Sequence, residues 1–232
     1  QQPPLADVAR FLSQATFGPV SPDEIVAVRA YGYDAWLQRQ FTLDAASHLG
    51  YLIEQAPRSM DGKPTEEMSY EAVWQQWLYS EAQLRARVAF ALSEIFVVSD
   101  KNTLLDQHPD SLAHIYDIFA NNAFGNYRTL LEQVTLSPAM GVYLNMMTNH
   151  RANLAVNLHP DENYAREINQ LFSVGLVMLN ADGTPQLSGG QPVPTYKQAE
   201  ITNFAHVFTG WTWAGCTSAA VFDSCGPDNN PT

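Results

Sequence analysis

The chain has 232 residues and a net charge of −12, because 24 acidic side chains outnumber 12 basic ones. A negative field of this size repels phosphate backbones and acidic lipids, which argues against nucleic acid as a partner. Hydrophobic residues make up 46% and charged residues 16%, as in packed globular chains, and no apolar run approaches the roughly 18 residues that membrane insertion needs.

Local signals predict helices through the first quarter of the chain. Ser21 and Pro22, followed by two acidic residues, are typical of a helix start. Gly32 then favours a helix end. Apolar residues recur at helical spacing on both sides of this segment. The helices expected here are residues 5–15, 21–30, 33–41 and 43–55, and residues 57–64 are expected to form a loop.

A long helical stretch is predicted over residues 65–98. Its second part, residues 84–98, is apolar on nearly every face, which predicts a central helix surrounded by others. Arg87 and Glu94 lie about two helical turns apart on this segment and so share a face. Because unpaired buried charges are costly, we expect both to meet charged partners.

Five more helices are expected, over residues 110–121, 127–135, 138–147, 161–174 and 198–208. Between the last two, Asp182 and Gly183 suit a hairpin turn, which predicts a small β-ribbon near residues 176–187. No repeat or linker divides the chain. The predicted fold is therefore mainly α, a multi-helix orthogonal bundle with a small β-ribbon, in a single domain over residues 1–232.

The densest polar group lies in the helix expected over residues 161–174. Glu162 and Arg166 form an i,i+4 pair, Glu167 follows, and Asn163 and Gln170 flank them. Two carboxylates and a guanidinium on adjoining faces suit acid/base chemistry or a divalent cation. The same residues also suit an ion-pair network that joins neighbouring helices.

A set of short motifs in this half of the chain resembles the bacterial domain-of-unknown-function family 1800. In chain order they are Glu162-Asn-Tyr-Ala-Arg-Glu167, Gln170-Leu-Phe172, Gly175-Leu176, Tyr196 and Phe208-Thr-Gly-Trp-Thr212. Members of that family are exported, are about twice this long, and are encoded near a second exported family of unknown function. The resemblance implies an extracytoplasmic (periplasmic or secreted) protein whose C-terminal half is missing from this chain.

The resemblance supplies no reaction, and the chain departs from the family at two places. His206 stands where many members carry an arginine, and residues 91–94 lack the tryptophan and histidine that many members have in the central helix. A metal bound through that histidine would lose a ligand here. No HExxH, GxSxG, Walker or GxGxxG signature occurs, so a cofactor or metal stays unknown.

The last part of the chain carries aromatic residues and both cysteines. Trp211 and Trp213 lie just beyond the last predicted helix, and we expect them, more than Trp74 or Trp77, to face a ligand such as a polysaccharide. The candidate ligand-binding residues are Asn163, Gln170, Tyr196, His206 and, of the two tryptophans, Trp211. Cys216 and Cys225 lie in one loop and form either a disulfide, which export would favour, or two free thiols.

Two functions fit these observations. The first is an exported scaffold or assembly protein that binds a protein partner or polysaccharide. The second is an extracytoplasmic hydrolase, acting on polysaccharide or with a divalent cation, whose carboxylates act as acid, base or cation ligand while an arginine stabilises developing negative charge. For either role we expect one polar cluster, formed by Glu94, Arg87, Glu162, Arg166 and Glu167.

Overall fold

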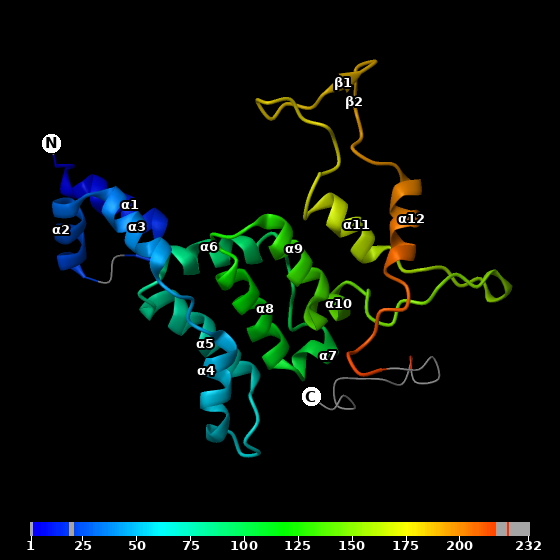
Figure 1. Ribbon diagram of the computed structural model, residues 1–232, viewed down its shortest axis with the longest axis horizontal. Helices are drawn as coiled ribbons and strands as arrows, with labels where there is room; N and C mark the ends of the chain where they lie inside the picture. The colour runs from blue at the N-terminus through cyan, green and yellow to red at the C-terminus, as the bar shows by residue number, and fades with distance from the viewer. Residues whose placement is uncertain (1, 19–20, 217–221, 223–232) are drawn as a thin grey trace. The chain divides into compact units, whose positions relative to one another are not determined.

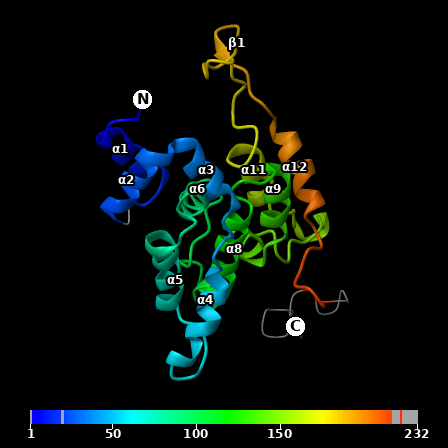
Figure 2. The same cartoon turned by 60° about the vertical axis from the view of Figure 1, so that its left-hand side comes forward.

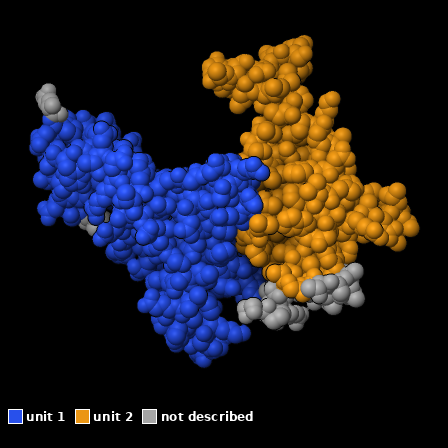
Figure 3. Space-filling model, in the orientation of Figure 1, with its two compact units in different colours: residues 1–134 blue, residues 135–232 orange. Residues whose placement is uncertain are grey.

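The computed structural model describes residues 2–18, 21–216 and 222, which fold mainly into α-helices. The chain divides into two compact units, residues 1–134 and residues 135–232 (Figure 3). The division falls inside one helix and not in a linker. The predicted fold class, mainly α with a small β-ribbon, is confirmed.

Unit 1 is entirely helical in its described part (Figure 1). Its helices begin at starts that the sequence encodes locally, such as Pro22 in the first turn of α2, and Gly32 ends that helix with a φ of +90° that other residues resist. The elements are α1 (Leu5–Ala15), α2 (Pro22–Tyr31), α3 (Tyr33–Thr42), α4 (His48–Gln55), the 3-10 helix η1 (Ala56–Arg58), α5 (Glu66–Tyr79), α6 (Gln83–Ser93), α7 (Thr103–Asp106), α8 (Pro109–Asn121) and most of α9 (Tyr127–Leu136).

Two apolar clusters stabilise unit 1. The first cluster joins α1, α2 and α3, and the second joins α4, α5 and α8. Helices α5 and α8 both lie beside α4, as the two views show (Figures 1 and 2). Burial of a valine, leucine or methionine side chain in such a cluster contributes about 1.5–3 kcal/mol. The buried members are Val8, Leu12, Val28 and Trp36 in the first cluster and Leu52, Met68, Ala72 and Ala113 in the second.

The long helix predicted over residues 65–98 is in fact two helices. The side chain of Gln83, at the start of α6, donates hydrogen bonds to the carbonyl oxygens of Trp77 (2.9 Å) and Ser80 (2.8 Å). It thereby satisfies carbonyl groups that the end of α5 leaves without helical partners. The break is stable because the Gln83 side chain replaces the missing helical hydrogen bonds.

Helix α6 ends at Ser93, five residues before the predicted end at Val98, and it is not the most buried helix. Three of its residues are buried, whereas eight are buried in α8. Arg85 explains part of the difference, because its guanidinium lies between helices and donates to the carbonyl oxygens of Leu43 (3.1 and 3.0 Å) and Ala120 (3.0 Å). The central helix of unit 1 is therefore α8.

Unit 2 packs short helices around Tyr164, which is 1% exposed. The ring of Tyr164 meets Phe208 edge-on at 5.0 Å, its hydroxyl lies 2.6 Å from that of Thr135, and burial raises its pKa to about 12. The elements are the end of α9, α10 (Pro138–Tyr143), the 3-10 helix η2 (Leu154–Val156), α11 (Asn163–Gln170), β1 (Leu187–Ser188), β2 (Gln191–Pro192) and α12 (Gln198–Val207).

One buried asparagine holds the loops of unit 2 together. The side chain of Asn149 accepts from the backbone N–H of Asp161 (2.8 Å) and donates to the carbonyl oxygen of the same residue (3.2 Å). The Asn149 carbonyl oxygen accepts from Gly210 (2.9 Å). The segment before α11 is thereby fixed beside the segment after α12.

Residues 176–195 form a β-ribbon that we call the arm, and it extends away from α11 and α12 (Figures 1 and 2). Three extended segments are joined by backbone hydrogen bonds, including Met178 to Val193 (2.8 Å) and Gln186 to Met178 (2.8 Å). The predicted turn at Asp182 and Gly183 is present. A second turn carries Gly189 and Gly190 at φ +59° and +78°, as in the type I′ turns that favour glycine, and connects the antiparallel strands β1 and β2.

Candidate functional site

The predicted pair of Glu162 and Arg166 is present in unit 2, at 3.0 Å between Oε2 and Nη2. Glu162 also accepts from the side chains of Thr202 (2.7 Å) and Gln198 (2.7 Å), both on α12. The Thr202 hydroxyl is the main reason that the pKa of Glu162 lies below its ordinary value. A carboxylate with three side-chain donors connects the start of α11 to α12.

Glu167, the second predicted carboxylate of α11, differs from Glu162. Its Oε2 atom is buried and has no hydrogen-bond partner among the residues that the structure describes. Buried polar atoms normally have hydrogen-bond partners. A buried carboxylate oxygen without one is therefore expected to carry a proton or to contact a ligand.

Three of the five predicted ligand-binding residues, Asn163, Gln170 and His206, lie on helices of unit 2, and Tyr196 lies just before α12. The Tyr196 hydroxyl donates to the side chain of Gln170 at 3.5 Å. Asn163 begins α11, and its backbone N–H donates to the Asp161 carboxylate (2.8 Å). His206 is exposed and bonds through Nδ1 to the Thr202 carbonyl oxygen of its own helix (2.8 Å), one turn beyond the Glu162 contact.

Trp211, the fifth predicted ligand-binding residue, is 36% exposed, and its ring lies 6.2 Å from Phe208. It is therefore partly packed against the unit 2 core. Trp74, which we expected to be a core residue, is more exposed, at 55%. The disulfide predicted between Cys216 and Cys225 stays a prediction, because Cys225 lies outside the described residues.

Arg87 and Glu94, the two remaining members of the predicted cluster, lie in unit 1. The Arg87 guanidinium lies 5.0 Å from the ring centre of Phe17 and 5.6 Å from that of Phe90. The expectation that Glu94 is buried is wrong, because α6 ends one residue earlier and leaves its side chain exposed. Convergence of these residues with Glu162, Arg166 and Glu167 stays a prediction.

A polar group that the sequence did not indicate lies at the start of α4. The Asp117 carboxylate, on α8, accepts from the backbone N–H of His48 (2.5 Å), that of Leu49 (3.2 Å) and the hydroxyl of Ser47 (2.7 Å). The His48 Nδ1 atom lies 2.9 Å from the same carboxylate. Burial alone would raise the pKa of Asp117, but the hydrogen bonds from His48 and Ser47 outweigh it and lower this pKa.

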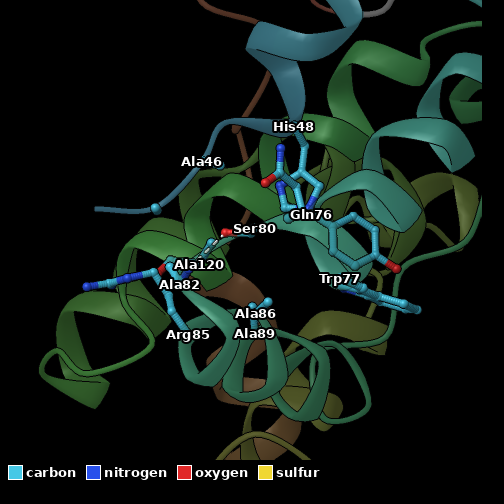
Figure 4. Close-up of a pocket in the computed structure, with 12 residues that line it drawn as sticks. Ala46, His48, Gln76, Trp77, Ser80, Ala82, Arg85, Ala86, Ala89 and Ala120 are labelled. Carbon is cyan, nitrogen blue, oxygen red and sulfur yellow. Dashed lines mark hydrogen bonds between the residues drawn. The ribbon is translucent and has the colours of Figure 1, made fainter. Parts of the chain in front are cut away.

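His48 also borders a cavity of about 20 Å³, large enough for one water molecule. Figure 4 shows His48 and Gln76 on one side of it and Ala86 and Ala89 of α6 on the other. The bond to Asp117 uses Nδ1, and Nε2 is buried without a partner in the described part of the chain. In the tautomer in which Nδ1 donates to Asp117, Nε2 is an acceptor.

A second and larger pocket, of about 280 Å³, lies between α5, residues 98–100 and α8. Trp77 and Tyr116 line both this aromatic pocket and the small cavity. Tyr70 also lines the aromatic pocket, and its hydroxyl is hydrogen-bonded to Asp100 and lies 2.9 Å from Glu66. The Asp100 bond is the main reason that the pKa of Tyr70 is raised and that of Asp100 is lowered.

The signals for these unit 1 sites were weak but present. Asp117 is the single acidic residue in the apolar run of residues 111–120, and a carboxylate buried in such a helix needs donors. The sequence did not indicate the contacts of Asp117 with His48 or of Tyr70 with Asp100, since these residues lie 69 and 30 positions apart along the chain. Within residues 2–18, 21–216 and 222, no group of three or more metal-ligating side chains was found, and no helix is long and apolar enough to cross a membrane.

The chain was compared with family models, with curated proteins and with solved structures. No curated protein and no solved structure matches the chain. The model of one family, "Protein of unknown function (DUF1800)", matches residues 10–231, nearly the whole chain. The chain therefore belongs to this family.

Proposed function

We propose that this chain is part of an exported assembly protein that binds a protein partner through the arm. The supporting observation is the exposure of apolar side chains on the arm: Leu176 is 58% exposed, Leu179 55% and Leu187 63%. Asp182 is the single charged residue among residues 176–195, in a chain whose net charge is −12. An apolar, almost uncharged ribbon fits a partner that offers an apolar groove.

The physical argument concerns the stability of the arm. A ribbon without a hydrophobic face packed on a core is marginal in water, and clustered exposed apolar side chains mark interaction surfaces. The arm is nevertheless regularly hydrogen-bonded and has two defined turns. A partner surface that covers these side chains would add the burial that the arm lacks.

The location of the protein is part of the same proposal. The family resemblance implies export. The binding partner that we propose is therefore the second exported protein that is encoded near members of this family. A disulfide between Cys216 and Cys225 would fit this compartment. Thiol titration of the denatured, unreduced chain is expected to detect no free sulfhydryl, and two free sulfhydryls would contradict the disulfide.

The test compares binding of that neighbouring exported protein by two variants. The first replaces Leu176, Leu179 and Leu187 with serine, and we expect it to bind at least about tenfold more weakly than the unmodified chain. The matched control replaces Val26 and Ile53, which are 58% and 63% exposed in unit 1, with serine. Equal binding by all three proteins would overturn the proposal. Light scattering gives a second test. A dimer of the unmodified chain that the arm variant alone fails to form would also overturn the proposal, because the arm would then bind a second copy of this chain.

A second candidate is an extracytoplasmic hydrolase in which Glu167 acts as acid or base. The observation that favours it is the buried, unpartnered Oε2 of this residue. If the protein cleaves a polysaccharide, Glu167→Gln is expected to abolish cleavage, whereas Asp182→Asn on the arm retains it. Hydrolysis that survives Glu167→Gln would exclude this role.

A further inference from the structure

We propose that the aromatic pocket of unit 1 binds one ring of a neutral pyranose sugar, with Trp74 as the stacking surface and Asp100 as the acceptor for its hydroxyl groups. The pocket lies between α5, residues 98–100 and α8. This site is separate from the arm, so it adds a ligand to the protein-binding role proposed above and does not depend on it.

The size of the pocket favours a single small ring. Its volume is about 280 Å³, near the lower limit of about 300 Å³ for pockets that take drug-sized molecules. Val73, Val98 and Leu112 supply apolar lining, and Ser69 and Ser99 supply hydroxyl groups. A sugar ring has the same division, with C–H groups on its faces and hydroxyls around its edge.

The orientation of Trp74 is set by its neighbours. Its ring meets Trp77 edge-on at 5.5 Å and 74°, and Trp77 stacks on Phe17 at 4.9 Å and 12°. Trp74 itself is 55% exposed. Tryptophan is usually more buried than this, and an indole that is held in place yet open to solvent offers a flat apolar face to a ligand at little entropic cost.

The Asp100 carboxylate supplies the polar contact. Its side chain is 11% exposed, and it accepts hydrogen bonds from Tyr70 and from Ser99 (3.3 Å). An ionised carboxylate has about four lone-pair sites, so it can still accept from ligand hydroxyls. A second carboxylate, that of Glu66, lies 2.9 Å from the same Tyr70 hydroxyl, so acidic and phosphorylated sugars are disfavoured. Lys101 lies 3.7 Å from both carboxylates and offsets part of their charge, which makes a neutral ligand a better fit than a quaternary ammonium cation.

Binding is tested with the methyl glycosides of glucose, galactose, mannose, xylose and N-acetylglucosamine, and with choline chloride as the cationic probe. We expect at least one glycoside to bind, detected by calorimetry and by a change in tryptophan fluorescence. Trp74→Ala is expected to weaken that binding at least about tenfold, Trp74→Phe less, and Asp100→Asn about tenfold. Tyr79→Ala, on the same helix and 71% exposed, is the matched control and is expected to bind normally.

Three outcomes would overturn the proposal. They are no binding of any glycoside to the folded protein, binding of choline alone, and glycoside binding that Trp74→Ala leaves unchanged. Circular dichroism and thermal melts of each variant show that it is folded, which Trp74 permits because its side chain is largely outside the core. None of these results bears on the arm, whose partner binding is measured separately.

Discussion

Asp117 and His48 are separated by 69 positions in the chain, yet a carboxylate oxygen of the first lies 2.9 Å from Nδ1 of the second. The same carboxylate accepts the first backbone N–H groups of α4, which a helix start leaves without partners. One side chain of α8 therefore caps the start of α4 and also bonds to the Nδ1 atom of His48.

Removing this carboxylate is expected to destabilise unit 1. Asp117→Ala should lower the free energy of unfolding by about 2–4 kcal/mol, because it removes a helix cap and leaves the buried imidazole without its partner. Asp110→Asn, on the exposed side of the same helix, should change it by less than about 0.5 kcal/mol. Denaturant unfolding monitored by circular dichroism measures both. An Asp117→Ala variant as stable as the control would show that the carboxylate contributes nothing.

The stabilisation by Asp117 is expected to depend on pH. Because the pKa of Asp117 is lower in the folded chain than its ordinary value of 3.8, the ionised form favours folding. The contribution is complete above the ordinary pKa and is lost as the pH falls through the lower folded value. The difference in unfolding free energy between the unmodified chain and Asp117→Asn should therefore be largest near neutral pH and shrink below about pH 4. A difference that stays constant down to about pH 2 would contradict this assignment.

The Glu162 network should contribute modestly, because Arg166 is 39% exposed and Glu162 30% exposed. We expect Arg166→Ala to cost about 1 kcal/mol or less at low salt, and less again at about 0.5 M salt, where charges are screened. Glu162→Ala should cost more, about 1–2 kcal/mol, since Thr202 and Gln198 also lose their acceptor. Thermal unfolding measures both variants. A larger loss of unfolding free energy for Arg166→Ala than for Glu162→Ala would contradict this prediction.

The second turn of the arm should depend on glycine. Replacing Gly189 and Gly190 with alanine forces two side chains into positive φ, which disfavours the turn between β1 and β2. We expect faster hydrogen exchange at the amides of Met178 and Val193, with little change in global unfolding, because the arm side chains are exposed. Unchanged exchange at these amides would show that the ribbon does not require this turn.

Local chemistry was enough to predict most of the helices and the ribbon. Ser21, Pro22 and Gly32 specify the ends of α2 within two residues of the prediction, and Asp182-Gly183 specifies a turn. Glu162 and Arg166 were predicted to pair for the same reason: four residues along a helix bring two side chains together whatever the tertiary structure is. Such features depend on backbone conformation over a few residues, which the sequence by itself determines.

The errors arose where side-chain hydrogen bonds or helix packing override a periodic pattern. The apolar run of residues 84–98 predicted one buried helix, but Gln83 stabilises a break before it and the helix ends at Ser93. The expectation that Trp74 is a core residue was wrong in the same way, since exposure depends on which surfaces neighbouring helices cover.

The sequence by itself therefore determined the mainly helical fold, the ribbon and the pairing of Glu162 with Arg166. Only the tertiary structure decided that His48 meets Asp117 and that Tyr70 meets Asp100 at the aromatic pocket. The physical reason is that a hydrogen bond or a pocket depends on distance in space. The packing of whole helices sets that distance for residues 30 or 69 positions apart, and no periodicity within a single helix encodes it.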